Sequence, residues 1–374
     1  MFTERITEST APEGAAPEGA APEGDFTRPV PRRRRGRAAA VTLAALLGAG
    51  LPAVPAAAAP AFGATAAPAA DRVSPAAHTP RPKPYPTVLG LPNGFSPEGI
   101  ALTGGAAYTG SLVDGSIQRV DLRTGVARQF APSPGPGRIA VGMETDRFGR
   151  LWVAGGGAGF WPGVRTTYRV YDTRTGAKLV DVEPAGAVYL NDVIVTRDAA
   201  WFTDTFSSVL VRVPIGDDGS IGRPRTVALG GEWTAGEGLN GNGIAATPDG
   251  RSLIVGHTSG ALYLVPAGAH DRARARRISL SGDEAALAAG ADGLVLDGRT
   301  LYVVGPTGVV DIRLSPSLTA GRVLGVTEVP GAAWPTTAAA FGDRLYVVDA
   351  NFGEDLVNVG NPDATFRIVA VPRP

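Results

Sequence analysis

The chain has 374 residues, 44% of them hydrophobic, and its 35 Lys and Arg residues balance 35 Asp and Glu residues. This length is enough for a large core, and zero net charge disfavours nucleic acid or an anionic membrane as the main partner, because both favour a basic surface. The absence of cysteine excludes disulfides, thiolate metal sites and cysteine nucleophiles.

Residues 1–59 have the pattern of a disordered n-region followed by a secretory signal. Repeats of APEGA near the start have no apolar face. A basic run, Arg33–Arg37, then precedes an apolar stretch, Ala38–Leu51, and small residues with Ala-x-Ala cleavage choices follow. The apolar stretch is shorter than the roughly 20 residues of a membrane span, although a single membrane anchor is the alternative. We expect export by the Sec or the twin-arginine route, a secreted protein, and no membrane contact after cleavage.

Residues 60–84 are rich in Pro and Ala and indicate a linker, and from Tyr85 onward one unit recurs. Each copy has a small apolar strand, a turn rich in Gly or Asp, and a second strand. The second strands carry aromatic residues in five copies: Tyr108, Trp152, Trp201, Tyr302 and Tyr346.

The six copies start 44 to 51 residues apart, a period that fits four-stranded propeller blades. We therefore predict an all-β fold over residues 85–374, a six-bladed β-propeller. A strand from Pro84–Leu91 would close the last blade and hide its edge. A β-helix or a sandwich would give shorter or uneven spacing.

In a propeller the innermost strands run in the same sense along the axis, so the residues at their starts gather at one mouth. In the six copies this position reads Glu98, Gly142, Asn191, Asn242, Asp292 and Thr336. Two carboxylates and two amides, without thiol or imidazole, suit Ca²⁺ or another hard divalent ion. Turn preferences also place Asn, Asp and Gly at strand starts, but four such residues in one repeat phase favour a metal site.

The end of each second strand returns to the same mouth. Asp204 and His257 lie there, and with Asp292 they are the candidate catalytic bases; for His257 a surface turn is an equal alternative. Phe160 and Trp161 lie near the entrance, where apolar walls around a polar floor would suit a small organic ligand.

These residues resemble the senescence marker protein/gluconolactonase family, which includes regucalcin, over roughly Leu91–Val371. The matching motifs are Glu98 in SPEGI, Asn191 in LNDV, Asn242 in NGI and Asp292 in ADGL. The resemblance implies a divalent ion held by these four side chains at the channel floor. It also implies that the ion polarises a lactone carbonyl while the Asp ligand helps to activate water.

The chain departs from that family and its relatives in its catalytic groups. Paraoxonase-type lactonases use a His dyad that has no counterpart in the second repeat, and no motif marks Arg138 as the sugar-gripping Arg of gluconolactonases. The chain is also similar to secreted bacterial proteins sometimes labelled superoxide dismutase, but a redox metal site normally has several histidines or thiolates.

The sequence therefore predicts a secreted, divalent-metal-dependent lactonase or ester hydrolase that acts on a small organic substrate. One alternative is a non-catalytic propeller in which Ca²⁺ stabilises a ligand-binding channel. Another is a lyase of the streptogramin-opening type. Such lyases share the P-x-G-I-A motif with this chain, but they need a histidine that faces the channel. We expect a monomer whose partner is a small molecule and not a nucleic acid.

Overall fold

The computed structural model describes residues 84–236, 238–282 and 290–373. The expected signal region, 1–59, and nearly all of the expected linker, 60–84, lie outside these residues. The described part is all-β, and its one described helix is the short 3-10 segment η2 (Glu354–Leu356). No helix in that part is long and apolar enough to cross a membrane.

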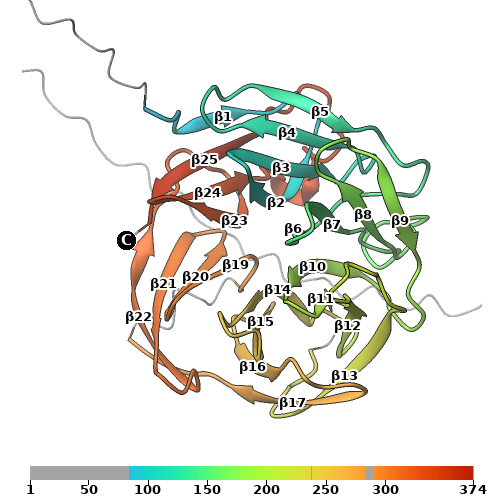
Figure 1. Cartoon of the computed structure of the whole chain (residues 1–374). Coiled ribbons are helices and arrows are strands. Elements are labelled where there is room, and N and C mark those ends of the chain that lie inside the picture. Colours follow the sequence, from blue (N-terminus) through green and yellow to red (C-terminus); the bar gives the residue numbers. More distant parts are fainter. Residues whose placement is uncertain (1–83, 237, 283–289, 374) are drawn as a thin grey trace, which may run out of the picture. The chain divides into compact units, whose positions relative to one another are not determined.

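The described strands form five hydrogen-bonded sheets, which Figure 1 shows set around a common centre. The first sheet contains β2 (Pro97–Thr103), β3 (Ala106–Ser111), β4 (Ile117–Asp121) and β5 (Ala127–Ala131). The second sheet contains β6 (Met143–Thr145), β7 (Arg150–Ala154), β8 (Tyr168–Asp172) and β9 (Lys178–Val182). Neighbouring strands in both sheets are antiparallel.

The third sheet has eight strands because two antiparallel groups are joined edge to edge. One group is β10 (Leu190–Val195), β11 (Ala199–Asp204), β12 (Val209–Pro214) and β13 (Arg225–Gly231). The other is β14 (Gly241–Ala246), β15 (Ser252–His257), β16 (Leu262–Pro266) and β17 (Arg272–Arg277). The outermost strands β13 and β17 pair in parallel from Ala228↔Arg272 to Gly231↔Ala275, so two groups that the repeats mark as separate share one ladder.

The remaining strands form two sheets. One contains β18 (Ser279–Ser281), β19 (Leu294–Asp297), β20 (Thr300–Gly305), β21 (Gly308–Leu314) and β22 (Ala320–Thr327). The other contains β1 (Val88–Gly90), β23 (Pro335–Phe341), β24 (Arg344–Asp349) and β25 (Arg367–Pro372). β1 pairs antiparallel with β25, so the segment expected to complete the last sheet does so and covers its edge.

The first strands of the six repeats contact one another in cyclic order. β2 contacts β6, β6 contacts β10, and the contacts continue through β14, β19 and β23 back to β2. The starts of these strands therefore lie around one axis, as the repeat pattern predicts, and Figure 1 shows them nearest the centre.

Burial follows the order of the strands within a sheet. The aromatic residues of the second strands are buried in all five repeats that carry them: Tyr108, Trp152, Trp201, Tyr302 and Tyr346. The outermost strands β5 and β9 are mostly exposed or half-buried. The outermost strand β17 alternates: it reads RARARR, and its Ala273 and Ala275 are buried while Arg272 and Arg274 are exposed. The hydrophobic cores thus lie between neighbouring sheets and leave the polar strand starts at the axis.

Candidate metal centre

Glu98, Asn191, Asn242 and Asp292, the four predicted metal ligands, line one cavity of about 170 Å³. Three lie in the innermost strands β2, β10 and β14, and Asp292 lies just before β19. We call this space the axial cavity. The structure therefore brings together side chains that are up to 194 positions apart in the sequence.

A β-bulge turns these side chains toward the axis. In β2 the ladder register shifts between Pro97 and Ile100, and the same shift occurs between Leu190 and Val193 in β10. β14 has the same irregularity between Gly241 and Ile244. Two residues on the inner strand then oppose one on its partner, which bends the strand and re-aims the side chain.

Glycine follows three of the four predicted ligands because neighbouring innermost strands approach closely at the bulge. A Cβ on Gly99 would lie 2.1 Å from the carbonyl oxygen of Val141, and one on Gly243 would lie 2.0 Å from that of Asp292. A Cβ on Gly293 would lie 2.4 Å from Thr337 Oγ1. Glycine is needed here for space and not for its backbone freedom.

A hydrogen bond orients the side-chain amide of Asn191. Asn191 Nδ2 donates to Thr205 Oγ1 at 2.9 Å, and that hydroxyl donates to the carbonyl of Gly241 at 2.8 Å. With the amide nitrogen bonded to Thr205, the side-chain oxygen Oδ1 of Asn191 accepts no hydrogen bond from the described residues. The side chain of Asn242 lies beside Asp292 and favours the ionised form of that carboxyl. The amide nitrogen of Asn191 is thus occupied by the protein, and its side-chain oxygen is left for another partner.

The two carboxylates are held close together away from bulk water. Removal from water, then the charge of Asp292 and that of Asp192, raise the pKa of Glu98 well above its usual value. Removal from water and the charge of Asp192 raise the pKa of Asp292 to about 7, although the bond from Asn242 opposes this rise. Among the described residues, no ion pair with Lys, Arg or His neutralises these carboxylates.

This set of donors fits a hard cation. A divalent ion would offset the repulsion between Glu98 and Asp292. The side-chain oxygens of Asn191 and Asn242 would complete its coordination. In the described part of the chain no group of three or more His, Cys, Asp or Glu side chains has the spacing of a metal site. A cation here would therefore depend on Asn191 and Asn242 as much as on the carboxylates.

The two remaining members of the predicted column do not add ligands. Val141, and not Gly142, lines the axial cavity, because Gly142 lies one residue further along its strand and takes the position of Gly99 and Gly243. Thr336 is fully buried, and its hydroxyl donates to the carbonyl of Glu98 at 2.9 Å.

Asp204, one candidate base, lies at the end of β11 and outside the axial cavity's lining. Its Oδ1 accepts the backbone N–H groups of Tyr189, Phe206 and Ser207, and its Oδ2 accepts that of Val188 at 2.6 Å. The side chain is fully buried. Asp204 thus holds two loops together, a role that leaves no oxygen directed at a substrate.

His257, another candidate base, ends β15 and also lies outside that lining. Its Nδ1 contacts Ser259 Oγ at 2.8 Å and accepts the Ser259 N–H at 3.0 Å. The ring packs against Trp233 and Tyr263, and burial lowers its pKa. Of the three candidate bases, Asp292 alone lines the axial cavity.

An apolar wall surrounds the polar floor of the axial cavity. Its members are Leu112, Val141, Phe160, Trp161, Tyr189, Phe352 and Leu356. The ring of Phe160 packs edge-on against Tyr189 at 5.0 Å. Phe160 and Trp161 therefore lie at the entrance as the sequence predicts, whereas Tyr189 and the two residues from the 352–356 segment were not foreseen.

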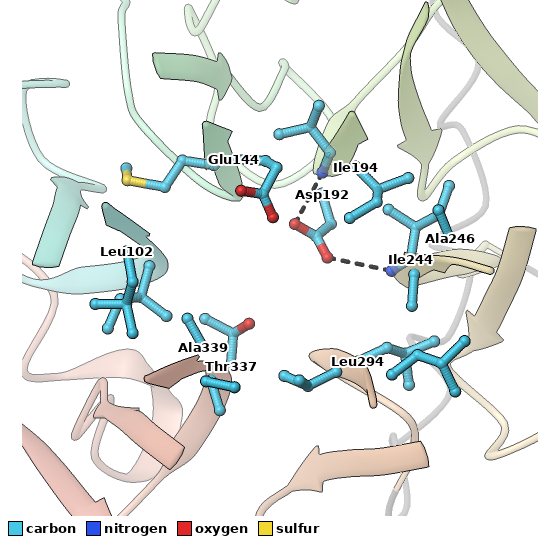
Figure 2. A pocket seen from close by; sticks show the side chains of 17 residues that line it. Leu102, Glu144, Asp192, Ile194, Ile244, Ala246, Leu294, Thr337 and Ala339 are labelled. Carbon is cyan, nitrogen blue, oxygen red and sulfur yellow. Dashed lines mark hydrogen bonds between the residues drawn. The ribbon is translucent and has the colours of Figure 1, made fainter. Parts of the chain in front are cut away.

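Sequence reasoning also missed Asp192 and Glu144. Both line a second cavity of about 210 Å³, and Figure 2 shows their carboxylates pointing into it. Burial raises the pKa of each to about 7, and for Glu144 the charge of Asp192 adds to the effect. Asp192 accepts the N–H groups of Val193 and Ile244. The sequence marks Asp192 in one way: it directly follows the predicted ligand Asn191, at the position where three other repeats have glycine.

No protein-family model matches the chain, and the search of curated proteins finds no match. Among solved structures, the crystal structure of the major Malassezia sympodialis allergen Mala s 1 is similar, with 16% identity and a TM-score of 0.57, over 76% of this chain and 96% of that one. U3-55K and the RRP9 WD40 repeats match at 10% and 11% identity, both with a TM-score of 0.47, over 73% of this chain and 80% and 79% of theirs. The fold is thus β-propeller-like, and at such low identity the likeness shows the fold alone.

Proposed function

We propose that residues 85–374 form a six-bladed β-propeller of the gluconolactonase-like kind. We propose that it binds one divalent ion, and that this ion is Ca²⁺. The six innermost strands that contact one another in cyclic order support this blade count. The eight-stranded sheet then represents two blades joined through β13 and β17.

One observation carries the metal proposal: four oxygen-bearing side chains from four repeats line the same cavity, and the amide nitrogen of one of them, Asn191, is already bonded to protein. The ligands would be Glu98, Asn191, Asn242 and Asp292. Hard oxygen donors with two negative charges suit Ca²⁺ better than a soft or redox-active metal.

We propose further that the protein is a lactonase or ester hydrolase acting on a small organic substrate. The bound ion would supply Lewis acidity toward the substrate carbonyl. Asp292 would orient the attacking water and take its proton, since it alone of the three candidate bases lines the axial cavity. Phe160, Trp161 and Tyr189 would hold the apolar part of the substrate and exclude water from it.

The test measures metal binding and hydrolysis separately in the full chain. We expect Ca²⁺ to raise the melting temperature and to be required for turnover of at least one member of a lactone and ester panel. Asp292→Asn is expected to abolish both effects. Asp311→Asn, at a buried Asp outside the axial cavity, is the control that keeps both. Calcium-independent turnover, or turnover that survives Asp292→Asn, would contradict the proposal.

The second candidate is a non-catalytic propeller stabilised by Ca²⁺. It is favoured by the positions of Asp204 and His257, which lie outside the axial cavity's lining and make hydrogen bonds within their own loops. A calcium-dependent rise in melting temperature without hydrolysis of any panel member would select this candidate. The lyase alternative loses support because neither described histidine, His257 or His270, lines the cavity.

The cellular setting belongs to the same proposal. The basic and apolar pattern within residues 1–59 supports export through a signal. We propose a secreted monomer whose partner is a small molecule. Mass measurement of the protein recovered from the medium would locate the cleavage site, and retention of the full chain in the cell would contradict export.

A further inference from the structure

A third cavity, of about 590 Å³, lies away from the axis. It is bounded by the outer strands β4 and β5 of the first sheet and by the turn after β8 in the second. Arg119, Arg128 and Arg174 line it together with Tyr108, Phe130 and Thr173. We call it the arginine cleft. Its lining contains no carboxylate.

The arginines are held together by the backbone. Arg119 in β4 and Arg128 in β5 are directly opposite partners in the ladder, so they share one face. Like charges at such a pair are destabilising unless something neutralises them. Arg174 comes from the neighbouring sheet, whose turn is fixed here by the hydrogen bond from Tyr108 Oη to the carbonyl of Thr173 at 3.3 Å.

None of these three arginines has a carboxylate partner within the described residues. Asp121 and Asp172 lie in the flanking turns, but each uses its Oδ1 to accept N–H groups of its own turn. Three arginines therefore line one cleft without a salt bridge among the described residues. Hydrogen bonds within the turns and, more weakly, the charges of Arg119 and Arg174 lower the pKa of Asp121 and Asp172.

The third repeat contains the same arrangement with its counter-ion present. Arg212 lies opposite Trp201 just as Arg119 lies opposite Tyr108, and Arg212 also pairs across strands with another arginine, Arg225. There, Asp198 binds Arg212 at 2.8 Å.

In the first repeat the position of Asp198 is taken by Gly105, within the two-residue Gly104–Gly105 turn between the paired residues Thr103 and Ala106. The carboxylate that binds Arg212 in the third repeat thus has no counterpart at Gly105, where a Cβ would meet nothing within 4 Å.

We propose that the arginine cleft binds a small anion of the phosphate or sulfate class, either free or as a monoester. Planar guanidinium groups match the oxygens of such anions in bidentate pairs. Phe130 is half-buried and packs edge to face against the buried Tyr108 at 4.9 Å, so its ring offers an aromatic surface on which the organic part of a monoester would rest.

The test is calorimetric titration of the full chain with inorganic phosphate and, separately, with inorganic sulfate. Ionic strength is held constant and a chelator is present, so that no metal in the axial cavity contributes. We expect saturable binding of one anion per chain. Phosphate binding tighter than sulfate would assign the cleft to phosphate groups, and the reverse order to sulfate groups.

Variants locate the binding site. Arg119→Gln is expected to weaken binding by about tenfold or more, because it removes a charge-assisted bidentate contact. Arg119→Lys keeps the charge but loses the planar fork, so it should fall between. Arg225→Gln, at the position in the third repeat that corresponds to Arg128, should leave the affinity unchanged.

Three results would overturn the proposal: no saturable binding of either anion, equal weakening in Arg225→Gln, or binding that is detected only with long polyanions such as heparin. Thermal melting of each variant shows that it is folded. Lactone turnover should be the same in Arg119→Gln as in the unsubstituted chain, so this proposal and that of a metal-dependent hydrolase fail independently.

Discussion

Asp204 and His257 occupy the same place in successive repeats. Asp204 is the ladder partner of Leu190 directly before Asn191, and His257 is the partner of Gly241 directly before Asn242. Each accepts the N–H of the residue two positions later, at 3.0 Å in both cases. The position therefore closes a turn beside a predicted ligand, and this explains why both residues appeared near the mouth without facing it.

The first prediction separates a structural from a catalytic Asp204. Asp204→Asn replaces a carboxylate that accepts four backbone N–H groups with an amide that has one acceptor oxygen. We expect a loss of about 1–3 kcal/mol in the free energy of unfolding, measured by urea denaturation, while turnover per folded molecule is retained. Asp363→Asn, at an exposed side chain, is the control. A fall in turnover without loss of stability would assign Asp204 to catalysis.

The second prediction concerns the charge balance of the axial cavity. Glu98→Gln removes one of two repelling carboxylates that are held away from water. In chelator the variant should melt at a higher temperature than the unsubstituted chain, because the cost of ionising Glu98 disappears. In calcium the order should reverse, since a ligand that binds only the folded state at 100 times its Kd adds about 2.7 kcal/mol.

Glu328→Gln, at an exposed position, should change neither melting temperature. The same order of melting temperatures with and without calcium would exclude Glu98 as a ligand.

The third prediction is a pH dependence of stability from the second cavity. Burial and the charge of Asp192 raise the pKa of Glu144 from 4.5 to about 7. A carboxyl with a raised pKa in the folded state stabilises most when protonated. Its contribution is complete below pH 4.5 and is lost as pH rises toward 7.

Glu144→Gln should therefore be more stable than the unsubstituted chain at pH 8, by on the order of 1–3 kcal/mol, with little difference at pH 4. Asp192 faces the same cavity and also has a raised pKa of about 7, so part of the slope should remain in the variant. Denaturation series in chelator across this range measure the effect. Parallel curves for the two proteins would refute it.

The fourth prediction tests the close approach of the innermost strands. A Cβ at Gly243 would lie 2.0 Å from the carbonyl oxygen of Asp292, so Gly243→Ala must displace one strand start. We expect a loss of about 3 kcal/mol or more in unfolding free energy, together with loss of the calcium effect. Gly268→Ala, where a Cβ meets nothing within 4 Å, is the matched control and should be neutral. Equal stability of the two variants would show that the strands separate readily at this point.

Much of the fold could be predicted from the sequence, because strands and turns are marked by residues that are close together in the chain. The recurrence of strand, Gly or Asp turn and aromatic strand marks each repeat, and buried residues such as Trp152 and Trp201 lie where that pattern predicts. The alternation of Arg and Ala in β17 likewise places its alanines inward without knowledge of the neighbours. The joining of two repeats through the parallel pair β13·β17 was not foreseen, since it depends on how far two outer edges extend in space.

The candidate site could be predicted from the sequence only in part. Asn191, Asn242 and Asp292 share a cavity as their repeat phase predicts, but counting residues placed Gly142 in that column where the folded chain has Val141. A shift of one residue moves a side chain to the other face of a strand. The turn between β6 and β7 is one residue longer than that of the first repeat, because Glu144 pairs with Trp152 eight positions later whereas Ala101 pairs with Tyr108 seven positions later. Counting back from Trp152 therefore misses the ligand position by one residue.

Repetition of residue types along the chain was thus sufficient to establish the strands, their turns and the set of oxygen donors at the strand starts. Which polar side chains face the axis, and which instead close a turn, was decided by the bulges and by hydrogen bonds between distant segments. Asn191 is oriented by Thr205, whereas Asp204 is bound by four N–H groups of its surrounding loops. The physical reason is that the direction of a side chain, and whether its polar atoms lack hydrogen-bond partners, depend on contacts between strands that are distant in the sequence.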